Sequence, residues 1–249
     1  MEFLASVGRW CADPAHWQGT DGIPVRLGEH VVLSAVALLC ATAIALPIGV
    51  ALGHTGRGGV AAINVANIGR ALPSMAMLAF ALPVAFALHL GLGFWPTMLA
   101  MVPLGIPAVL TNSYVAIRVV DRDVVDVAHA VGMTEWQVLR HVELPLAASI
   151  IVAGVRNAAV AIVATATLGA LVASGGLGRY IVDGLARQEY ERLFVGAVLV
   201  ALLSVATEWA FGLVERAVVS PGSAVDRSQQ SDVWRRAAPS SLSVDAGRG

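Results

Sequence analysis

The sequence predicts an all-α integral membrane protein with about five transmembrane helices. Of its 249 residues, 57% are hydrophobic and 13% are charged, and the mean hydropathy is +0.74. One soluble domain cannot cover so much apolar surface, so the surplus must face lipid. Apolar runs of about 20 residues or more, the length that crosses a bilayer, recur along the chain. A polar segment at 126–145, "DVAHAVGMTEWQVLRHVELP", interrupts them.

The predicted spans are nearly free of charge. We place them at about 31–53, 60–90, 92–117, 146–172 and 193–214, with one arginine each in the second and fourth and one glutamate in the fifth. Prolines inside the second and third spans are tolerable because neighbouring helices can satisfy the freed backbone groups. The second run is long enough that a break at "RALPS", residues 70–74, would divide it into two shorter helices and give six in total.

The placement of arginine predicts the orientation. Cytoplasmic segments retain positive charge, and with the N-terminus outside, nine arginines fall on the cytoplasmic side against five on the other. Residues 1–27 lack the basic start and apolar core of a signal peptide, and they then form an extracellular arm. Residues 28–217 form the transmembrane domain in the cell membrane, with loop 121–145 in the cytoplasm. Residues 218–249 are polar and rich in Ser and Gly, which predicts a disordered cytoplasmic tail.

The polar loop has the pattern of two short helices. Residues 124–131 and 135–142 are each about two helical turns long, and Gly132 between them suits a chain reversal. Leu144 and Pro145 start the next span, where a proline in the first turn costs no hydrogen bond. Small side chains at Ala128 and Ala130 would let one face lie close to another protein. The pattern by itself equally fits an amphipathic connector on the lipid surface.

The spacing within this loop resembles the EAA loop of ABC-transporter permeases. That pattern is Glu-Ala-Ala, three residues, Gly, nine residues, Ile, one residue, Leu-Pro. Every interval fits without a gap, and the departures, Asp for Glu and Val for Ala, preserve the acid and the apolar character. The resemblance implies a MetI-like permease core whose loop forms coupling helices that dock into a groove on a separate ATPase subunit. The matching residues are Asp126, Val127, Ala128, Gly132, Val142, Leu144 and Pro145.

The absence of lysine agrees with a separate ATPase. All sixteen basic residues are arginine, whereas a P-loop needs a lysine that reaches the terminal phosphates of the nucleotide. We therefore expect this chain to be a permease subunit with no catalytic residues and no cofactor of its own, with ATP and magnesium bound by the partner ATPase. The Gly-rich run at 173–180, "ASGGLGRY", is expected to be a tight extracellular turn.

Further motifs resemble the osmoprotectant branch of these permeases, which carries glycine betaine, choline, carnitine or proline betaine. They are Leu-Pro-Ser at 72–74, Ala-Gly-Val-Arg at 153–156 and Thr-Ala-Thr at 165–167. The methionine-permease branch shares the EAA loop and a GGLG-like turn, so a methionine or other amino-acid permease stays an alternative. The resemblance implies import, an extracellular substrate-binding protein and a second permease chain, in either a homodimer or a heterodimer.

The candidates for the translocation path are polar or helix-breaking residues inside the spans. A charge within a membrane is expected to face the bundle interior, water or a partner. Two arginines there could attract the carboxylate of a zwitterion, or could instead pair with Glu208 or with carbonyl groups freed at a proline. The candidates are Arg70, Pro73, Ser74, Arg156, Thr165 and Thr167.

Three other classes of function are disfavoured. A net charge of −1 gives no basic face for nucleic acid. The histidines lack the spacing of metal ligands, so no metal site is expected. An ion-coupled secondary transporter, the remaining alternative, would normally need a relay of carboxylates within the membrane, and the first four predicted spans contain no Asp or Glu.

Overall fold

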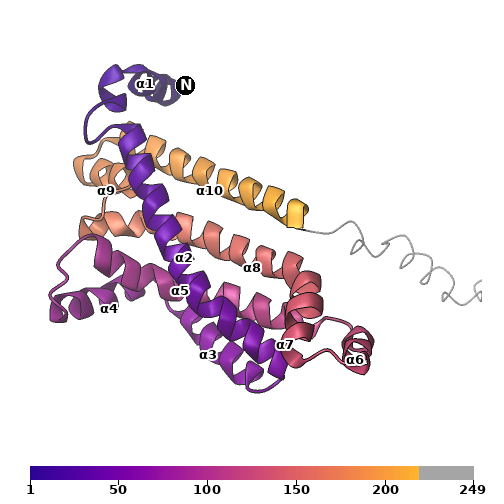
Figure 1. The fold of residues 1–249 in the computed structure, drawn as a ribbon. Helices are drawn as coiled ribbons and strands as arrows, with labels where there is room; N and C mark the ends of the chain where they lie inside the picture. The colour runs from indigo at the N-terminus through magenta and orange to yellow at the C-terminus, as the bar shows by residue number, and fades with distance from the viewer. Residues whose placement is uncertain (219–249) are drawn as a thin grey trace, which may run out of the picture.

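The computed structural model describes residues 1–218, apart from the side chains of residues 65 and 69–71. This part of the chain is built from helices (Figure 1), which confirms the predicted all-α membrane class. The tail predicted at 218–249 lies outside the described residues except for its first residue. In chain order the elements are α1 (Glu2–Ala12), η1 (Pro14–Trp17), α2 (Ile23–Thr55), α3 (Gly59–Ala71), α4 (Ser74–Ala87), α5 (Phe94–Arg118), α6 (Arg122–Ala130), α7 (Glu135–Val138), η2 (Leu139–Glu143), α8 (Leu144–Thr165), η3 (Ala166–Val172), α9 (Gly178–Arg187) and α10 (Tyr190–Val218).

Within residues 1–218, four helical stretches are long and apolar enough to cross a membrane: α2, α5, Glu135–Val172 and α10. The single span predicted over 60–90 is instead two helices, α3 and α4, divided at the 70–74 break. Leu72 is extended there, with φ −76° and ψ 128°, because the residue before a proline is disfavoured in the helical region. Helices of 13 and 14 residues are about 20 Å long, which is shorter than the roughly 30 Å hydrocarbon core.

The centre of the fold is the contact between α2 and α5. Along α2, a small residue recurs every fourth position at Ala37, Ala41, Ala45, Gly49 and Gly53, and the three alanines are fully buried. Residues four apart share one face of a helix. Small side chains let membrane helices approach closely, which increases the van der Waals contact that drives their association. This stripe therefore places α2 directly against the backbone of α5.

Helix α8 packs against both α5 and α2, and α10 lies against α8 and α9. The fully buried His30 of α2 ties the far end of α8 to this core, because its Nε2 lies 2.9 Å from the carbonyl oxygen of Val163 and donates to it. This contact is made in the last turn of α8, just before the chain tightens into the 3₁₀ segment η3.

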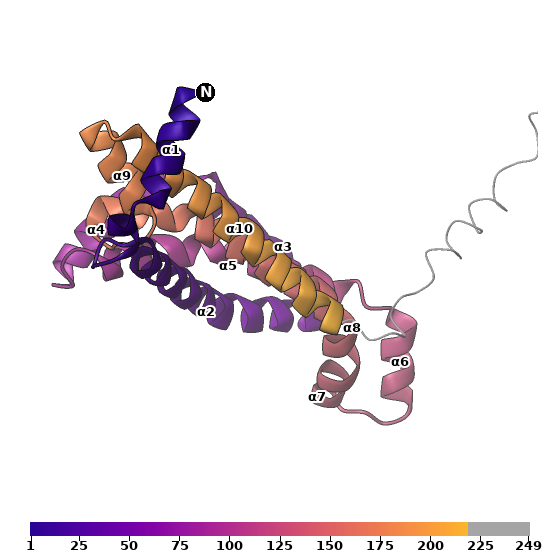
Figure 2. The same ribbon diagram turned by 90° about the horizontal axis from the view of Figure 1, so that it is seen from above.

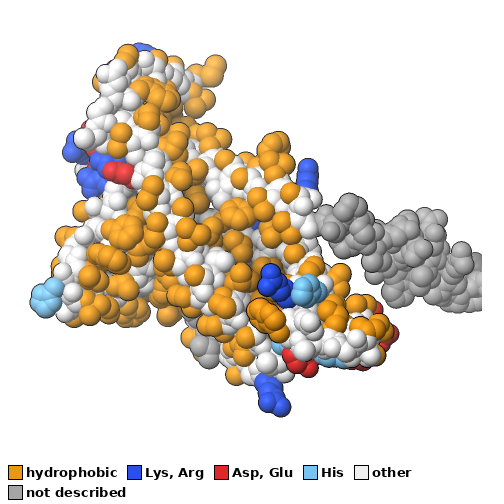
Figure 3. Space-filling view, in the orientation of Figure 1, with side chains coloured by type: hydrophobic (Ala, Val, Ile, Leu, Met, Phe, Trp, Pro, Cys, Tyr) orange, Lys and Arg blue, Asp and Glu red, His pale blue; other side chains and the backbone are white. Residues whose placement is uncertain are grey.

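The two polar ends of the molecule lie far apart. Helices α6 and α7 project side by side from one end, whereas α1 lies at the other (Figures 1 and 2). Charged side chains gather at these ends, and apolar side chains cover the region between them (Figure 3). Large exposed apolar residues occur on α4 and α10 in particular, as expected of helices that face lipid or another chain.

Gly49→Val tests the close approach of α2 and α5. A Cβ atom at this position would lie 2.7 Å from the Leu110 carbonyl oxygen and 2.8 Å from the Ser113 Cβ. The helix backbone would have to shift to relieve these contacts. We expect a loss of roughly 1–3 kcal/mol, typical of overpacking, measured as a lower thermal unfolding midpoint in detergent. Gly28→Val, on the same helix but with nothing within 4 Å of its Cβ, is the control. Equal midpoints for the two variants would contradict the packing described here.

Candidate functional site: the α6–α7 loop and the polar sites of the helix bundle

The loop predicted from the polar segment is a helical hairpin. Helix α6 begins at Asp121, whose carboxylate accepts the Asp123 N–H at 3.0 Å. Helix α7 begins with a reciprocal cap between Thr134 and Gln137, which satisfies two backbone donors of the first turn. Gly132 lies between the helices with φ +89°, a left-handed conformation that favours glycine. The sequence thus encodes both helix starts and the reversal between them.

The predicted coupling residues divide between two faces of the hairpin. Ala128 is buried, and with Val142 and Leu144 it packs into a core cluster that includes Ile117 and Val138. This inner face anchors the hairpin on the ends of α2 and α5. The other predicted residues, Asp126, Val127, Gly132 and Pro145, are exposed.

The outer face of the hairpin carries exposed apolar side chains outside the long membrane helices. Val127, Val131 and Trp136 are 63%, 74% and 64% exposed. Val124, Val127 and Val131 follow the i, i+3, i+7 spacing of one helix face. An apolar surface at a polar end of the molecule is typical of a protein contact site, and we define Val124, Val127, Val131 and Trp136 as the docking face.

A chain of paired acids and histidines joins the hairpin to α2, and sequence reasoning missed it. Glu143, only 1% exposed, lies with Oε2 2.5 Å from Nδ1 of His54 at the end of α2. On its other side, Nε2 of His54 lies 3.4 Å from Glu135, which in turn lies 3.3 Å from His129. The sequence did carry one signal, because Glu143 stands between the apolar residues Val142 and Leu144. An acid in such surroundings is rarely buried unless it is paired.

The predicted path residues do not form one site. Ser74 and Thr165 meet, together with Thr97, in a pocket of about 10 Å³ between α4, α5 and η3, which is room for about one water molecule. Thr165 and Thr167 donate to carbonyls of their own helical segment, those of Ala161 and Ala164. This arrangement leaves no passage for a metabolite-sized molecule through that pocket.

The remaining path candidates lie elsewhere. Pro73 stands at the break between α3 and α4, and the side chain of Arg70 lies outside the described residues. Arg156 of α8 forms the expected ion pair with Glu208 of α10, at 3.5 Å, and a second one with Glu215 at 3.0 Å. The pairing with Glu215 was not predicted. Glu208 and Glu215 are seven residues apart, which is about two turns of helix, so they lie on the same face of α10. Both can therefore reach the same arginine.

The opposite end of the molecule is held by a second polar network. The Gly-rich run turns at Gly175 and Gly176, with φ +83° and +75°, and Glu29 accepts the Gly176 N–H at 2.7 Å. Arg26 pairs with both Glu29 and Asp21. Its hydrogen bond holds the pKa of the Asp21 carboxyl below its usual range. A lowered pKa means that the pair stabilises the fold above the ordinary Asp pKa and is lost as pH falls through the lowered value, although the exposed position of Asp21 keeps this contribution small.

Comparison with known proteins agrees with the fold. The model of the family described as "Binding-protein-dependent transport system inner membrane component" matches residues 43–220. The chain belongs to this family. The predicted resemblance to the binding-protein-dependent ABC permeases is thereby confirmed, and the chain is a multi-pass membrane permease.

Relatives of this permease include a glycine betaine/carnitine/choline transport system permease protein of Bacillus subtilis, 36% identical over 79% of this chain and 88% of the relative. A choline transport system permease protein of the same organism is 34% identical over 78% and 87%. A carnitine transport permease protein of Listeria monocytogenes is 37% identical over 76% and 82%. Among solved structures, the inward-facing MetNI methionine ABC transporter gives a TM-score of 0.68 at 21% identity, over 78% of this chain and 95% of that chain. This last likeness concerns the fold alone.

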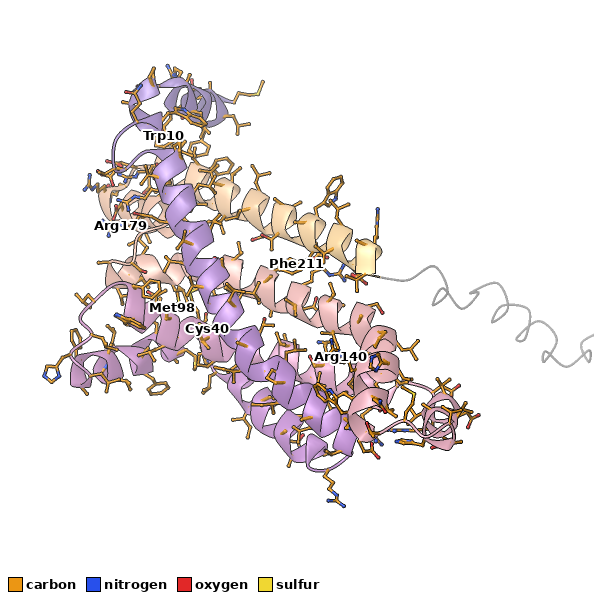
Figure 4. All side chains as sticks on the ribbon, viewed as in Figure 1. Trp10, Cys40, Met98, Arg140, Arg179 and Phe211 are labelled. Atoms are coloured by element: carbon orange, nitrogen blue, oxygen red, sulfur yellow. The ribbon has the colours of Figure 1, made fainter. Side chains whose placement is uncertain are left out.

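Glu143→Ala tests the anchoring of the hairpin. Removing the Glu143 carboxylate leaves Nδ1 of His54 without its hydrogen-bond partner, which typically costs about 1–3 kcal/mol, and the hairpin should loosen on α2. Trypsin cleaves after arginine and lysine, and the exposed Arg140 (labelled in Figure 4) lies beside the pair. We expect faster tryptic cleavage at this position, resolved by mass spectrometry of the fragments.

Glu135→Ala is the matched control for this experiment. Glu135 also approaches His54, but its side chain is 74% exposed, and exposed pairs contribute about 0–1 kcal/mol. Equal cleavage rates for the two variants would show that burial of Glu143 does not anchor the hairpin.

Proposed function

We propose that this chain is the membrane permease of an ATP-driven importer for quaternary-ammonium osmoprotectants such as glycine betaine, choline or carnitine. The observation that carries the proposal is the anchored α6–α7 hairpin with its exposed docking face, in a family whose relatives of 34–37% identity are permeases for these compounds. The hairpin is the surface through which an ATPase would transmit force to the permease, and the relatives indicate the class of substrate.

The docking face contacts a separate ATPase subunit in this proposal. Val127, Val131 and Trp136 would fill an apolar groove of the partner, while Asp126 adds a charge at the rim. Apolar and aromatic anchors of this kind dominate the energy of protein interfaces. The chain has no lysine for a P-loop, so ATP and magnesium belong to the ATPase and the permease itself is not an enzyme.

The proposed topology places the α6–α7 end in the cytoplasm, as the distribution of arginine favours. The α1 end then faces outward, where the extracellular binding protein delivers substrate. A second permease chain, identical or related, completes the path, because the exposed apolar faces of α4 and α10 suit contact with another membrane helix. When ATP closes the two ATPases, their grooves draw the two hairpins together, and the bundles rock between inward-facing and outward-facing states. Hydrolysis resets them.

The second candidate is a methionine or other amino-acid importer. It is favoured by the shared fold with the methionine ABC transporter, and also by an amino-acid ABC transporter solved with histidines, at a TM-score of 0.64 and 17% identity. Both likenesses concern the fold, whereas the osmoprotectant permeases share a larger part of the sequence itself. The sequence relatives therefore favour the first candidate.

Gly132→Val tests the coupling role of the hairpin. A branched side chain is strained at φ +89°, by roughly 1–3 kcal/mol, so the two short helices should change their angle at the docking face. We expect uptake by the reconstituted transporter to fall at least about tenfold relative to ATP hydrolysis, since a tenfold loss corresponds to only about 1.4 kcal/mol.

Gly91→Val is the control for this change. Gly91 also lies in a turn at positive φ, +71°, with nothing within 4 Å of its Cβ, but it lies between α4 and α5 and outside the hairpin. An unchanged ratio of uptake to ATP hydrolysis in Gly132→Val, or the same loss in Gly91→Val, would remove the case for coupling through this hinge.

Competition for uptake tests the substrate class. Uptake of labelled glycine betaine by the complete transporter should be reduced by excess choline or carnitine and not by methionine, because the first two share the quaternary ammonium group. Inhibition by methionine alone would instead support the amino-acid importer.

A further inference from the structure

We propose that the pocket between α8 and α10 binds the osmoprotectant zwitterion on its way through the membrane. Trp209 and Glu208 would hold the quaternary ammonium group, and Arg216 and Arg156 would hold the carboxylate. This inference rests on the proposed function and assigns a site to its substrate.

The pocket is a sizeable opening at the middle and end of α10. It has a volume of about 240 Å³ and is continued by a second opening of about 390 Å³ that shares Arg156, Gly212 and Arg216 with it. Phe211, labelled in Figure 4, marks this segment of α10, which lies alongside α8. The remaining lining residues of the first opening are Glu208, Trp209 and Leu213.

The composition of the lining matches a zwitterion. Two arginines and two glutamates meet here, counting Glu215 of the second opening, so a ligand with one charge of each sign leaves the site balanced. A quaternary ammonium group binds to the face of an aromatic ring, and Trp is the best of these. Trp209 is 75% exposed and lines the pocket. A guanidinium group matches a carboxylate with two parallel hydrogen bonds.

The position of these charges indicates water or a ligand beside them. Helix α10 is apolar enough to span a membrane, and ionisable groups within such helices face a water-filled cavity, the bundle interior or a partner rather than lipid. Glu208 lies inside the predicted span 193–214 and Arg216 just beyond its cytoplasmic end, and the openings beside them provide room for water or a ligand.

Arg156 retains an unused donor in this arrangement. Its guanidinium is anchored by Glu215 at 3.0 Å, but its Nε is buried and lacks a hydrogen-bond partner among the described residues. The nearest oxygen of Glu208 lies 3.5 Å from it, beyond the usual range of about 2.7–3.2 Å. This donor is buried beneath the wall of the opening, so a ligand carboxylate would reach Arg156 through the part of its side chain that is exposed, 27% of the whole.

Gly212 keeps the pocket open. Glycine is less favourable than alanine within a helix, yet a Cβ at this position would meet nothing within 4 Å, so packing within the described part of the chain does not require glycine. It faces the openings at the i+3 position from Trp209. The absence of a side chain provides the room that a ligand would occupy.

Equilibrium binding to the purified permease–ATPase complex tests the site, with the binding protein omitted. The complex is held in nanodiscs of phosphatidylglycerol, which has no quaternary ammonium group, and is titrated with labelled glycine betaine and labelled choline. Trp209→Ala should raise the Kd for both ligands about 5- to 30-fold, the range expected from loss of a desolvated cation–π contact. Gly212→Leu should abolish saturable binding by filling the pocket.

Arg216→Gln separates ligand contact from a structural role. It should raise the Kd for glycine betaine about tenfold or more and leave the Kd for choline, which has no carboxylate, within about twofold, because a charged hydrogen-bonded contact is worth at least a factor of ten. Damage to the fold would change both values together. The controls are Leu202→Ala and Val214→Leu, two exposed positions of α10 outside both openings, and they should bind as the unmodified chain does.

Several outcomes would overturn the site. If the unmodified complex imports glycine betaine with its binding protein, yet shows no saturable binding without it or the same Kd in all variants, the site is wrong and the proposed function stands. If no quaternary ammonium compound is imported, both fall. If Gly212→Leu instead prevents assembly of the complex, the glycine serves contact with the second chain. If adding phosphatidylcholine to the nanodiscs displaces the labelled ligand, the pocket holds a lipid headgroup.

Discussion

The close approach of α2 and α5 is the constraint on which the rest of this structure depends. In lipid there is no hydrophobic driving force between helices, so association relies on van der Waals contact at short range. The small-residue stripe of α2 supplies that contact over most of the helix, with Gly49 directly against the backbone of α5. Because α8 packs against both α5 and α2, the position of α8, and through it that of α10, follows from the first contact.

The same contact gives the hairpin a fixed base. The inner face of α6 and the turn after α7 pack into a cluster that includes Val50 of α2 and Ile117 of α5, and the Glu143–His54 pair adds a buried polar tie to α2. A force applied to the docking face therefore reaches α2 through packed side chains and the Glu143–His54 hydrogen bond rather than through a flexible loop. The turn Leu139–Glu143 is a π-helical one that runs directly into α8, and such turns often occur at functional sites. One hairpin thus connects to three of the long helices, α2, α5 and α8.

The charged residues of the bundle form two separate networks, one at the α1 end and one between α8 and α10. At the α1 end, Arg26, Glu29 and the Gly-rich turn are joined by hydrogen bonds, and these charges serve the fold. Between α8 and α10 the ion pairs of Arg156 leave one donor unsatisfied and border open space. Arg192 at the α1 end likewise has a buried Nε without a partner among the described residues and borders an opening of about 320 Å³, so the two networks differ in the residues that line them rather than in the completeness of their pairing.

Local properties of the sequence are enough to predict the membrane class and the hairpin: hydropathy over about 20 residues, the Thr134–Gln137 cap and the glycine at the turn. The sequence also allowed for the break at Pro73, whose cause is local too. Which side chains meet could not be predicted in this way. The Glu143–His54 pair joins residues 89 positions apart, and Glu215 reaches Arg156 from another helix. Such pairings depend on the relative placement of whole helices, which the packing of α2, α5 and α8 sets and which no short stretch of sequence encodes.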